Sequence, residues 1–292
     1  MKIAALRNWS LGLALGASAS GACFGNPPGA PAESKALMFN VLTQRSVALT
    51  SQYWNPILSH VSKKSGVPLE LRLARTTKDG NAAAEKGAYD FLFTNHFFTP
   101  ERDSLGFRVI ARPLGPGIRG QVIVPTDSPI QSLQELEGRE VAFPTPDAFA
   151  AYWLTMDGLM RTKVNVRRVF AGNQEAASAQ LRVNKVAAAG VSDVVIERYA
   201  NREGFTYRVL WSSELFNDLC IMVHPRVPRD KVDAVRSALT GMSKDPEGRA
   251  VLQAGAELLK VKGEQGFIAS DNRDYDNYRN FFKNTPVKAI VN

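Results

Sequence analysis

The stretch LMFNVLTQRSVALTSQYWNPILSHVSKKSGVPLELRL, residues 37–73, holds the pattern that decides the fold. Residues 37–42 are mostly apolar and predict a strand. Tyr53, Ile57 and Val61 then fall on one face of a helix, which Gly66 ends. Residues 69–73 alternate between apolar and polar side chains and predict a second strand. A strand, a helix and a strand in this order favour an α/β fold with parallel strands.

The same alternation continues along the chain. Strands are predicted at 89–93, 107–112, 121–124, 140–143, 166–170, 186–191, 207–211 and 219–223. Helices are predicted between most of them, at 78–86, 147–160, 174–184 and 193–201. The strand at 219–223 is expected to return to the first section of the chain, and an aromatic-rich helix over 275–282 to pack on that section.

The N-terminus has the pattern of an exported protein. Lys2 and Arg7 form a positive region, an apolar stretch follows, and residues 18–22 are small. We therefore expect a signal peptide over residues 1–22, too short to span a bilayer. Cys23 follows Ser20-Gly21-Ala22 as in bacterial lipoproteins, so it is a candidate lipidation site. The alternative is an ordinary leader. Residues 23–36 read as a tether rich in proline, glycine and alanine.

Composition favours a globular domain and gives no sign of nucleic-acid binding. The chain has 292 residues, 45% of them hydrophobic and 22% charged, with a formal net charge of +8. Its basic residues are scattered, without a long Lys/Arg run or basic residues interleaved with aromatic ones. We interpret the charge as a solvated surface.

No motif for catalysis or metal binding occurs. The three histidines lack metal-ligand spacing, and nucleophile elbows, phosphate loops and Cys-x-x-Cys pairs are absent from the sequence. We therefore expect no enzyme activity, cofactor or metal. His60 is expected on the surface, His224 in a structural role at a strand end, and Cys220 as a buried, inert thiol.

The candidate ligand site lies where strands end. In open α/β folds, ligands bind beyond the carboxyl ends of strands, and the helix starts there offer free N–H groups to anions. The loops at 43–46, 144–147 and 172–174 fit this rule, and the guanidinium of Arg45 could bind a carboxylate or phosphate. The predicted ligand-binding residues are Gln44, Arg45, Asn95, His96, Thr145, Asp147, Gln174 and Ser192, with Phe149 and Tyr152 as cleft walls.

Taken in order, several segments resemble those of phosphate, phosphite and phosphonate solute-binding proteins of ABC transporters. The segments are Phe39-Asn40-Val41-Leu42, Tyr53-Trp54-Asn55-Pro56-Ile57-Leu58, Lys86-Gly87-Ala88-Tyr89-Asp90, Val122-Ile123-Val124, Asp127-Ser128-Pro129-Ile130, residues 133–143, Phe170-Ala171-Gly172, residues 209–213 and residues 223–228. The resemblance covers roughly residues 37–252.

The resemblance implies a class II periplasmic-binding fold, in which two α/β lobes close on a ligand. Two crossing strands would join the lobes, near residues 121–124 and 217–221. The expected lobes are residues 37–120 plus 218–292, and residues 121–217. The implied function is capture of a small anionic ligand for the membrane subunits of an ABC importer, in the periplasm, or anchored to a membrane outside the cytoplasm if Cys23 is lipidated. A periplasmic sensor that feeds a receptor or kinase is the alternative, and an exported enzyme is a more distant one.

The sequence departs from the phosphonate-binding pattern at two turns. Residues 147–151, Asp-Ala-Phe-Ala-Ala, carry no hydroxyl where family members have a turn rich in serine and threonine. Gln174 stands where a histidine is common. Asp147 would repel a phosphonate dianion, so we expect phosphate to bind weakly. A larger organic anion or a zwitterion should bind better.

Overall fold

The structure is a computed structural model that describes residues 35–42 and 46–288. Residues 35–292 belong to one structural unit, which holds two β-sheets. The expected signal peptide, Cys23, most of the tether, Gln44 and Arg45 lie outside the described residues. Within those residues, no helix is both long enough and apolar enough to cross a membrane.

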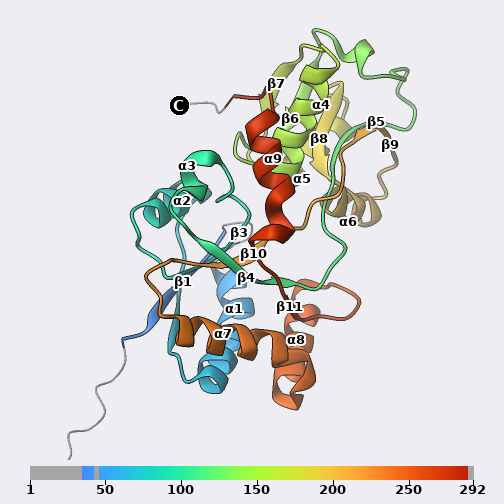
Figure 1. Cartoon of the computed structure of the whole chain (residues 1–292). Coiled ribbons are helices and arrows are strands. Elements are labelled where there is room, and N and C mark those ends of the chain that lie inside the picture. The colour runs from blue at the N-terminus through green and yellow to red at the C-terminus, as the bar shows by residue number, and fades with distance from the viewer. Residues whose placement is uncertain (1–34, 43–45, 289–292) are drawn as a thin grey trace, which may run out of the picture. The chain divides into compact units, whose positions relative to one another are not determined.

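The first sheet has six strands in the order β11-β4-β10-β3-β1-β2 (Figure 1). They are β1 (Leu37–Val41), β2 (Leu69–Arg72), β3 (Phe91–Thr94), β4 (Arg108–Pro113), β10 (Cys220–Val223) and β11 (Phe267–Ala269). β1 is parallel to β2 and β3, as the opening stretch predicts. β10 lies antiparallel between β3 and β4, so the apolar run at 219–223 does return to the first section.

Five helices of the described chain belong to the same part of it as the first sheet, and the longer ones bury apolar side chains. They are α1 (Val47–Ser65), α2 (Thr77–Glu85), α3 (Pro100–Asp103), α7 (Arg229–Gly241) and α8 (Pro246–Leu259). Ser46 caps the start of α1 and Gly66, in the left-handed region, ends it. The predicted face of α1 is buried, and Ile57 and Val61 share a core cluster with Phe39 of β1.

The second sheet has five strands in the order β7-β6-β8-β5-β9. They are β5 (Gly120–Pro125), β6 (Glu140–Phe143), β7 (Arg167–Phe170), β8 (Ala188–Ser192) and β9 (Tyr207–Ser212), with the helices α4 (Thr155–Arg161), α5 (Gln174–Arg182) and α6 (Asp193–Glu203). β6 is parallel to β7 and β8, and β5 is antiparallel to β8 and β9. The helix predicted over 147–160 begins as a π-helix, Phe149–Leu154, and continues as α4.

Two segments join the sheets, residues 114–119 and residues 213–219. The crossing expected at 121–124 is therefore shifted, because those residues lie in β5 and are mostly buried in the sheet. The crossing expected at 217–221 overlaps the second segment at residues 217–219, and residues 220 and 221 already belong to β10. The two segments pair with each other. The N–H of Ile118 donates to the carbonyl of Phe216 at 2.7 Å, and the N–H of Phe216 donates back at 2.9 Å.

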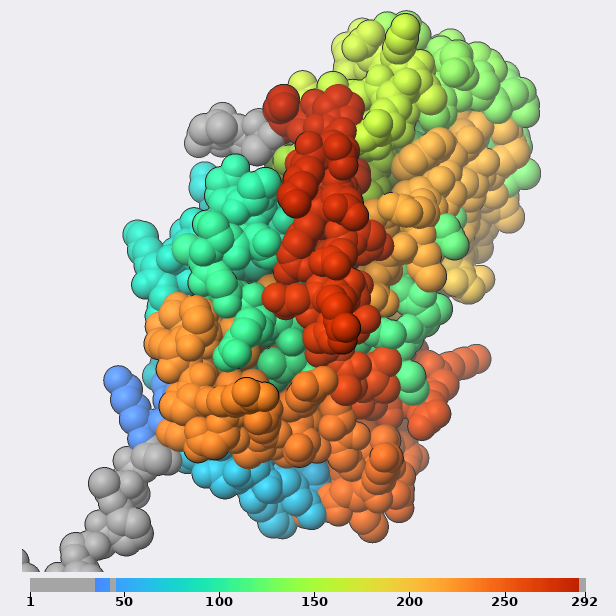
Figure 2. Space-filling view, viewed as in Figure 1, coloured from blue at the N-terminus to red at the C-terminus, as the bar shows by residue number. Residues whose placement is uncertain are grey.

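The C-terminal helix α9 (Asp276–Asn284) contacts both lobes, rather than the first alone as expected. Tyr278 of this helix packs among first-lobe residues such as Phe98 and also stacks on Phe149. Just beyond the helix, Val287 lies in a core cluster of the second sheet. Figure 2 shows α9 as a continuous red ridge on the face in view.

A substitution of Gly117 would test how closely the two crossing segments are paired. Its φ is +92°, and a Cβ there would overlap the carbonyl oxygen of Phe216. Gly117→Ala should therefore lower the free energy of unfolding by roughly 1–3 kcal/mol, measured by urea denaturation. Gly115→Ala is the matched control, since nothing lies within 4 Å of a Cβ at Gly115. Equal stability of both variants would contradict the tight pairing.

Candidate functional site

The first lobe contributes Asn95 and His96, which directly follow β3. Asn95 is only 5% exposed, and its Nδ2 donates to the Tyr278 hydroxyl at 3.3 Å. His96 is half-buried. Its Nδ1 lies 3.2 Å from Nδ2 of Asn81 on α2, so the imidazole accepts from the amide and carries its proton on Nε2.

The environment of His96 keeps its ring neutral. Burial lowers the pKa of His96 to about 4; Asp147 opposes this shift, and Arg102 adds to it. Arg102 also donates to the carbonyl of His96 at 3.1 Å. The charge of Asp147, in the turn after β6, therefore acts on the ring of His96.

A small hollow lies at the carboxyl ends of β1 and β3. Its polar lining comes from Asn40, Thr77, Asn81 and Thr94, and its apolar lining includes Leu42 and Phe97. Asn81 also contacts His96. Sequence reasoning missed Asn40 and Asn81. The asparagine inside the apolar run 37–42 was a usable signal for Asn40, whereas nothing marked Asn81.

On the second sheet, the predicted site residues Gln174 and Ser192 contact each other. Oε1 of Gln174 accepts from the backbone N–H of Ser192 at 2.7 Å. The next residue, Asp193, accepts from the N–H of Arg119 at 3.0 Å. A hydrogen bond therefore connects this edge of the second sheet to the first crossing segment, residues 114–119. Gln174 acts here as an acceptor, so its oxygen is already used within the protein.

Thr145 and Asp147 lie half-buried in the turn after β6. The carbonyl of Thr145 accepts from the N–H of Ala148 at 3.3 Å, which closes the turn. Neighbouring bonds hold the turn against the loop after β7, since Gly172 donates to the carbonyl of Pro144 at 2.8 Å. The turn that carries Thr145 and Asp147 is therefore held by backbone hydrogen bonds within it and to the loop after β7.

The two predicted wall residues lie in the cores. Tyr152 is fully buried, meets Phe143 edge-on, and accepts from Arg168 at 3.2 Å, so the prediction that it walls a cleft is wrong. Phe149 is 4% exposed, and Tyr278 covers its ring at a centroid distance of 4.1 Å. The expectation failed because residues 149–154 coil into a π-helix whose apolar side chains face inward.

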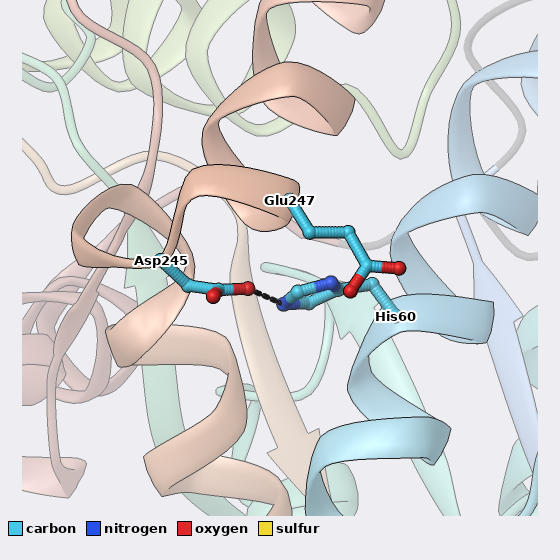
Figure 3. Close-up of side chains that lie close together, drawn as sticks. All are labelled: His60, Asp245 and Glu247. Carbon is cyan, nitrogen blue, oxygen red and sulfur yellow. Dashed lines mark ion pairs between the residues drawn. The ribbon is translucent and has the colours of Figure 1, made fainter.

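A second cluster of ionisable side chains lies at the junction of α1 and α8. Figure 3 shows His60, Asp245 and Glu247 pointing toward one another. His60 is 4% exposed, contrary to the surface position expected, because the start of α8 covers it. Lys63 pairs with Glu247 at 3.0 Å and Lys64 with Asp245 at 3.2 Å. Each carboxylate is thus paired with a lysine, and we interpret the cluster as a set of ion pairs that connects α1 to the start of α8.

The remaining cysteine is inert as predicted. Cys220 is fully buried in β10, and its Sγ lies 3.2 Å from the carbonyl oxygen of Thr94. Burial raises the pKa of the thiol far above its usual value, so the reactive thiolate does not form near neutral pH.

Comparison with known protein families gives a match over most of the chain. The model of the family described as "ABC transporter, phosphonate, periplasmic substrate-binding protein" matches residues 39–275. The chain belongs to this family of substrate-binding proteins. Its members are transport proteins that act outside the cytoplasm, which agrees with the resemblance seen in the sequence. A comparison with curated protein sequences finds no match.

Solved structures share the two-lobe fold of this substrate-binding protein at low sequence identity. A binding component of an ABC phosphonate transporter from Pseudomonas aeruginosa has a TM-score of 0.67 and 16% identity, covering 84% of this chain and 85% of its own. PhnD1 from Prochlorococcus marinus, in complex with methylphosphonate, has a TM-score of 0.68 and 12% identity, covering 85% and 97%. A Xanthomonas citri protein bound to ATP has a TM-score of 0.70 and 16% identity, covering 86% and 96%.

The lowered pKa of His96 predicts a pH dependence of stability. An unfolded histidine protonates near pH 6.5, whereas His96 in the folded protein protonates near pH 4. Between these values the unfolded chain binds more protons, so stability falls as the pH drops from 6.5 to 4. His96→Gln should reduce the loss of unfolding free energy between pH 7.5 and pH 5, measured by denaturant titration. An NMR titration that places the pKa of His96 near 6.5 would contradict this.

Proposed function

We propose that this substrate-binding protein captures a small organic anion that also carries a neutral or cationic part. The observation that carries the proposal is the turn after β6, residues 147–151, which offers no hydroxyl and carries the acidic Asp147, whose charge acts on His96 in the loop after β3. A ligand held there would contact both lobes. The lobes we propose are residues 37–120 plus 218–292, and residues 121–217. Sheet membership supports this division, although α9 contacts both parts.

Helix starts at strand ends support an anionic group on the ligand. α1 and α5 begin shortly after β1 and β7, and their first turns are capped by Ser46 and Asn173. Beyond the cap, the N–H groups and the helix dipole favour negative charge. Gln44 and Arg45 precede Ser46 in the sequence, and we propose that the guanidinium of Arg45 adds a bidentate contact. The methylphosphonate and ATP in two structural neighbours both carry phosphorus oxyanions.

The second-lobe turn supports the other part of the ligand. Residues 147–151 offer no hydroxyl to an oxyanion, and Asp147 is acidic. The neutral imidazole of His96 adds no positive charge above about pH 5. A compact dianion would therefore meet repulsion without compensation on this side. A zwitterion can place its cationic end there and its anionic end at the helix starts.

Ligand class is tested by calorimetric titration with phosphate, phosphite, 2-aminoethylphosphonate and small carboxylates. We expect 2-aminoethylphosphonate or another organic anion to bind better than phosphate. Arg45→Ala should weaken the best ligand of the panel about tenfold or more, since a charged hydrogen bond contributes about 1.5–3 kcal/mol. Arg229→Ala is the control, because the Arg229 side chain is 90% exposed. Exclusive tight binding of phosphate or phosphite would contradict the proposal.

Lipid anchoring is tested through Cys23. We propose that the mature protein starts at Cys23, with its thiol acylated, and is held at the membrane. Cys23→Ser should then move the protein from the membrane fraction to the soluble periplasmic fraction, and intact mass should show loss of residues 1–22 from the wild type. Cys220→Ser is the control, since Cys220 is a buried residue of β10. A wild-type protein found wholly in the soluble fraction would argue against the anchor.

A further inference from the structure

The hydroxyl of Tyr278 lies between the predicted ligand loop and a crossing segment. It donates to the backbone carbonyl of Asn217 at 2.6 Å and accepts from Nδ2 of Asn95 at 3.3 Å. The Tyr278 side chain is fully buried, and its ring stacks on Phe149. Burial raises the pKa of Tyr278 well above its usual value, so the hydroxyl keeps its proton and remains a donor.

This arrangement fixes which way the Asn95 amide faces. A hydroxyl has one proton, and the Tyr278 proton is used by the carbonyl of Asn217. Asn95 must therefore donate to Tyr278 with its NH2 group, which turns its Oδ1 the other way. Among the described residues, none donates to this Oδ1.

The surroundings of Asn95 favour a hydrogen-bond donor on the ligand. The acidic side chain of Asp147 acts on His96, the residue next to Asn95. An amide oxygen and a carboxylate both accept hydrogen bonds and neither donates. The N–H that His96 carries on Nε2 is the exception on this side of the site. A ligand that presents an ammonium group would satisfy the two acceptors together.

We infer that Tyr278 is a positioning residue that makes the site selective for ligands with a hydrogen-bond donor such as an ammonium group. It acts by holding Asn95 with its carbonyl oxygen toward the ligand. The inference rests on the proposed function, and names the part of the ligand that the Asn95 side of the site recognises. The reverse amide orientation would offer an NH2 group there and would favour a second anionic group.

Tyr275 supplies a matched control on the same C-terminal segment. It is also fully buried, and its hydroxyl donates to the carbonyl of Asp218 at 2.9 Å, one residue from the carbonyl used by Tyr278. Asn95 donates to Tyr278 and not to Tyr275. Tyr275→Phe and Tyr278→Phe therefore each remove one buried hydroxyl with a backbone acceptor. Only Tyr278→Phe releases Asn95.

The first measurement uses the ligand-free protein. The Asn95 side-chain amide protons, assigned by their absence in Asn95→Asp, should give two separate and slowly exchanging NMR signals in the wild type. Tyr278→Phe should shift these signals and speed their exchange about tenfold or more, whereas Tyr275→Phe should leave them in place. Signals that stay unchanged in Tyr278→Phe, or change equally in both variants, would overturn the positioning role.

The second measurement compares 2-aminoethylphosphonate with ethylphosphonate, which differ by the amino group. The wild type and Tyr275→Phe should prefer the amino compound. In Tyr278→Phe this preference should fall about three- to tenfold, as expected for one freed hydrogen bond. In an Asn95→Ala background, Tyr278→Phe should have no further effect on it. An unchanged preference in Tyr278→Phe would overturn the inference.

The two measurements separate this inference from the proposed function. If the wild type binds neither phosphonate, the proposed ligand class and the selectivity are both contradicted. The NMR signals of Asn95 then still decide whether Tyr278 holds the amide. If the wild type binds both compounds and only the selectivity fails, the proposed function stands and the inference is overturned.

Discussion

The paired backbone hydrogen bonds between Ile118 and Phe216 are the constraint on which the rest of the structure depends. They join the only two stretches of described chain that pass between the sheets before the C-terminal helix. Close pairing requires Gly117, because a side chain there would overlap the carbonyl of Phe216. A Cβ at Gly120, where β5 begins, would likewise meet the carbonyl of Ala150. The two sheets are therefore joined through a short and closely packed junction.

Aromatic side chains extend this junction to the C-terminal helix. Phe216 meets Phe149 and Tyr278 edge-on, while Phe149 and Tyr278 stack on each other. Phe149 starts the π-helix that follows the Asp147 turn, and Tyr278 binds Asn95. Residues of both candidate site loops are thus attached to one buried cluster. Aromatic pairs of this kind contribute about 0.5–1.5 kcal/mol each beyond burial, which keeps the two loops in a defined relation.

The chemistry of the proposed site depends on which of its side chains are neutral and which are charged. His96 stays uncharged because its ring is buried, and the oxygen of Gln174 is used by Ser192. We propose that Asp147 and the oxygen of Asn95 act as acceptors for the ligand, while the starts of α1 and α5 and the side chain of Arg45 favour negative charge. The proposed site then has one side suited to an anionic group and another side suited to a hydrogen-bond donor.

The sequence by itself determined the order of strands and helices, the α/β class and the family, because apolar periodicity and turn residues are local properties. It also identified the loops that hold Asn95, His96, Gln174 and Ser192, since strand ends can be read along the chain. Only the tertiary structure decided that Tyr152 is buried, that the helix after Asp147 begins as a π-helix, and that Asn81 and Tyr278 support the site. Those contacts join residues up to 183 positions apart. Their partners are chosen by packing, which no local pattern encodes.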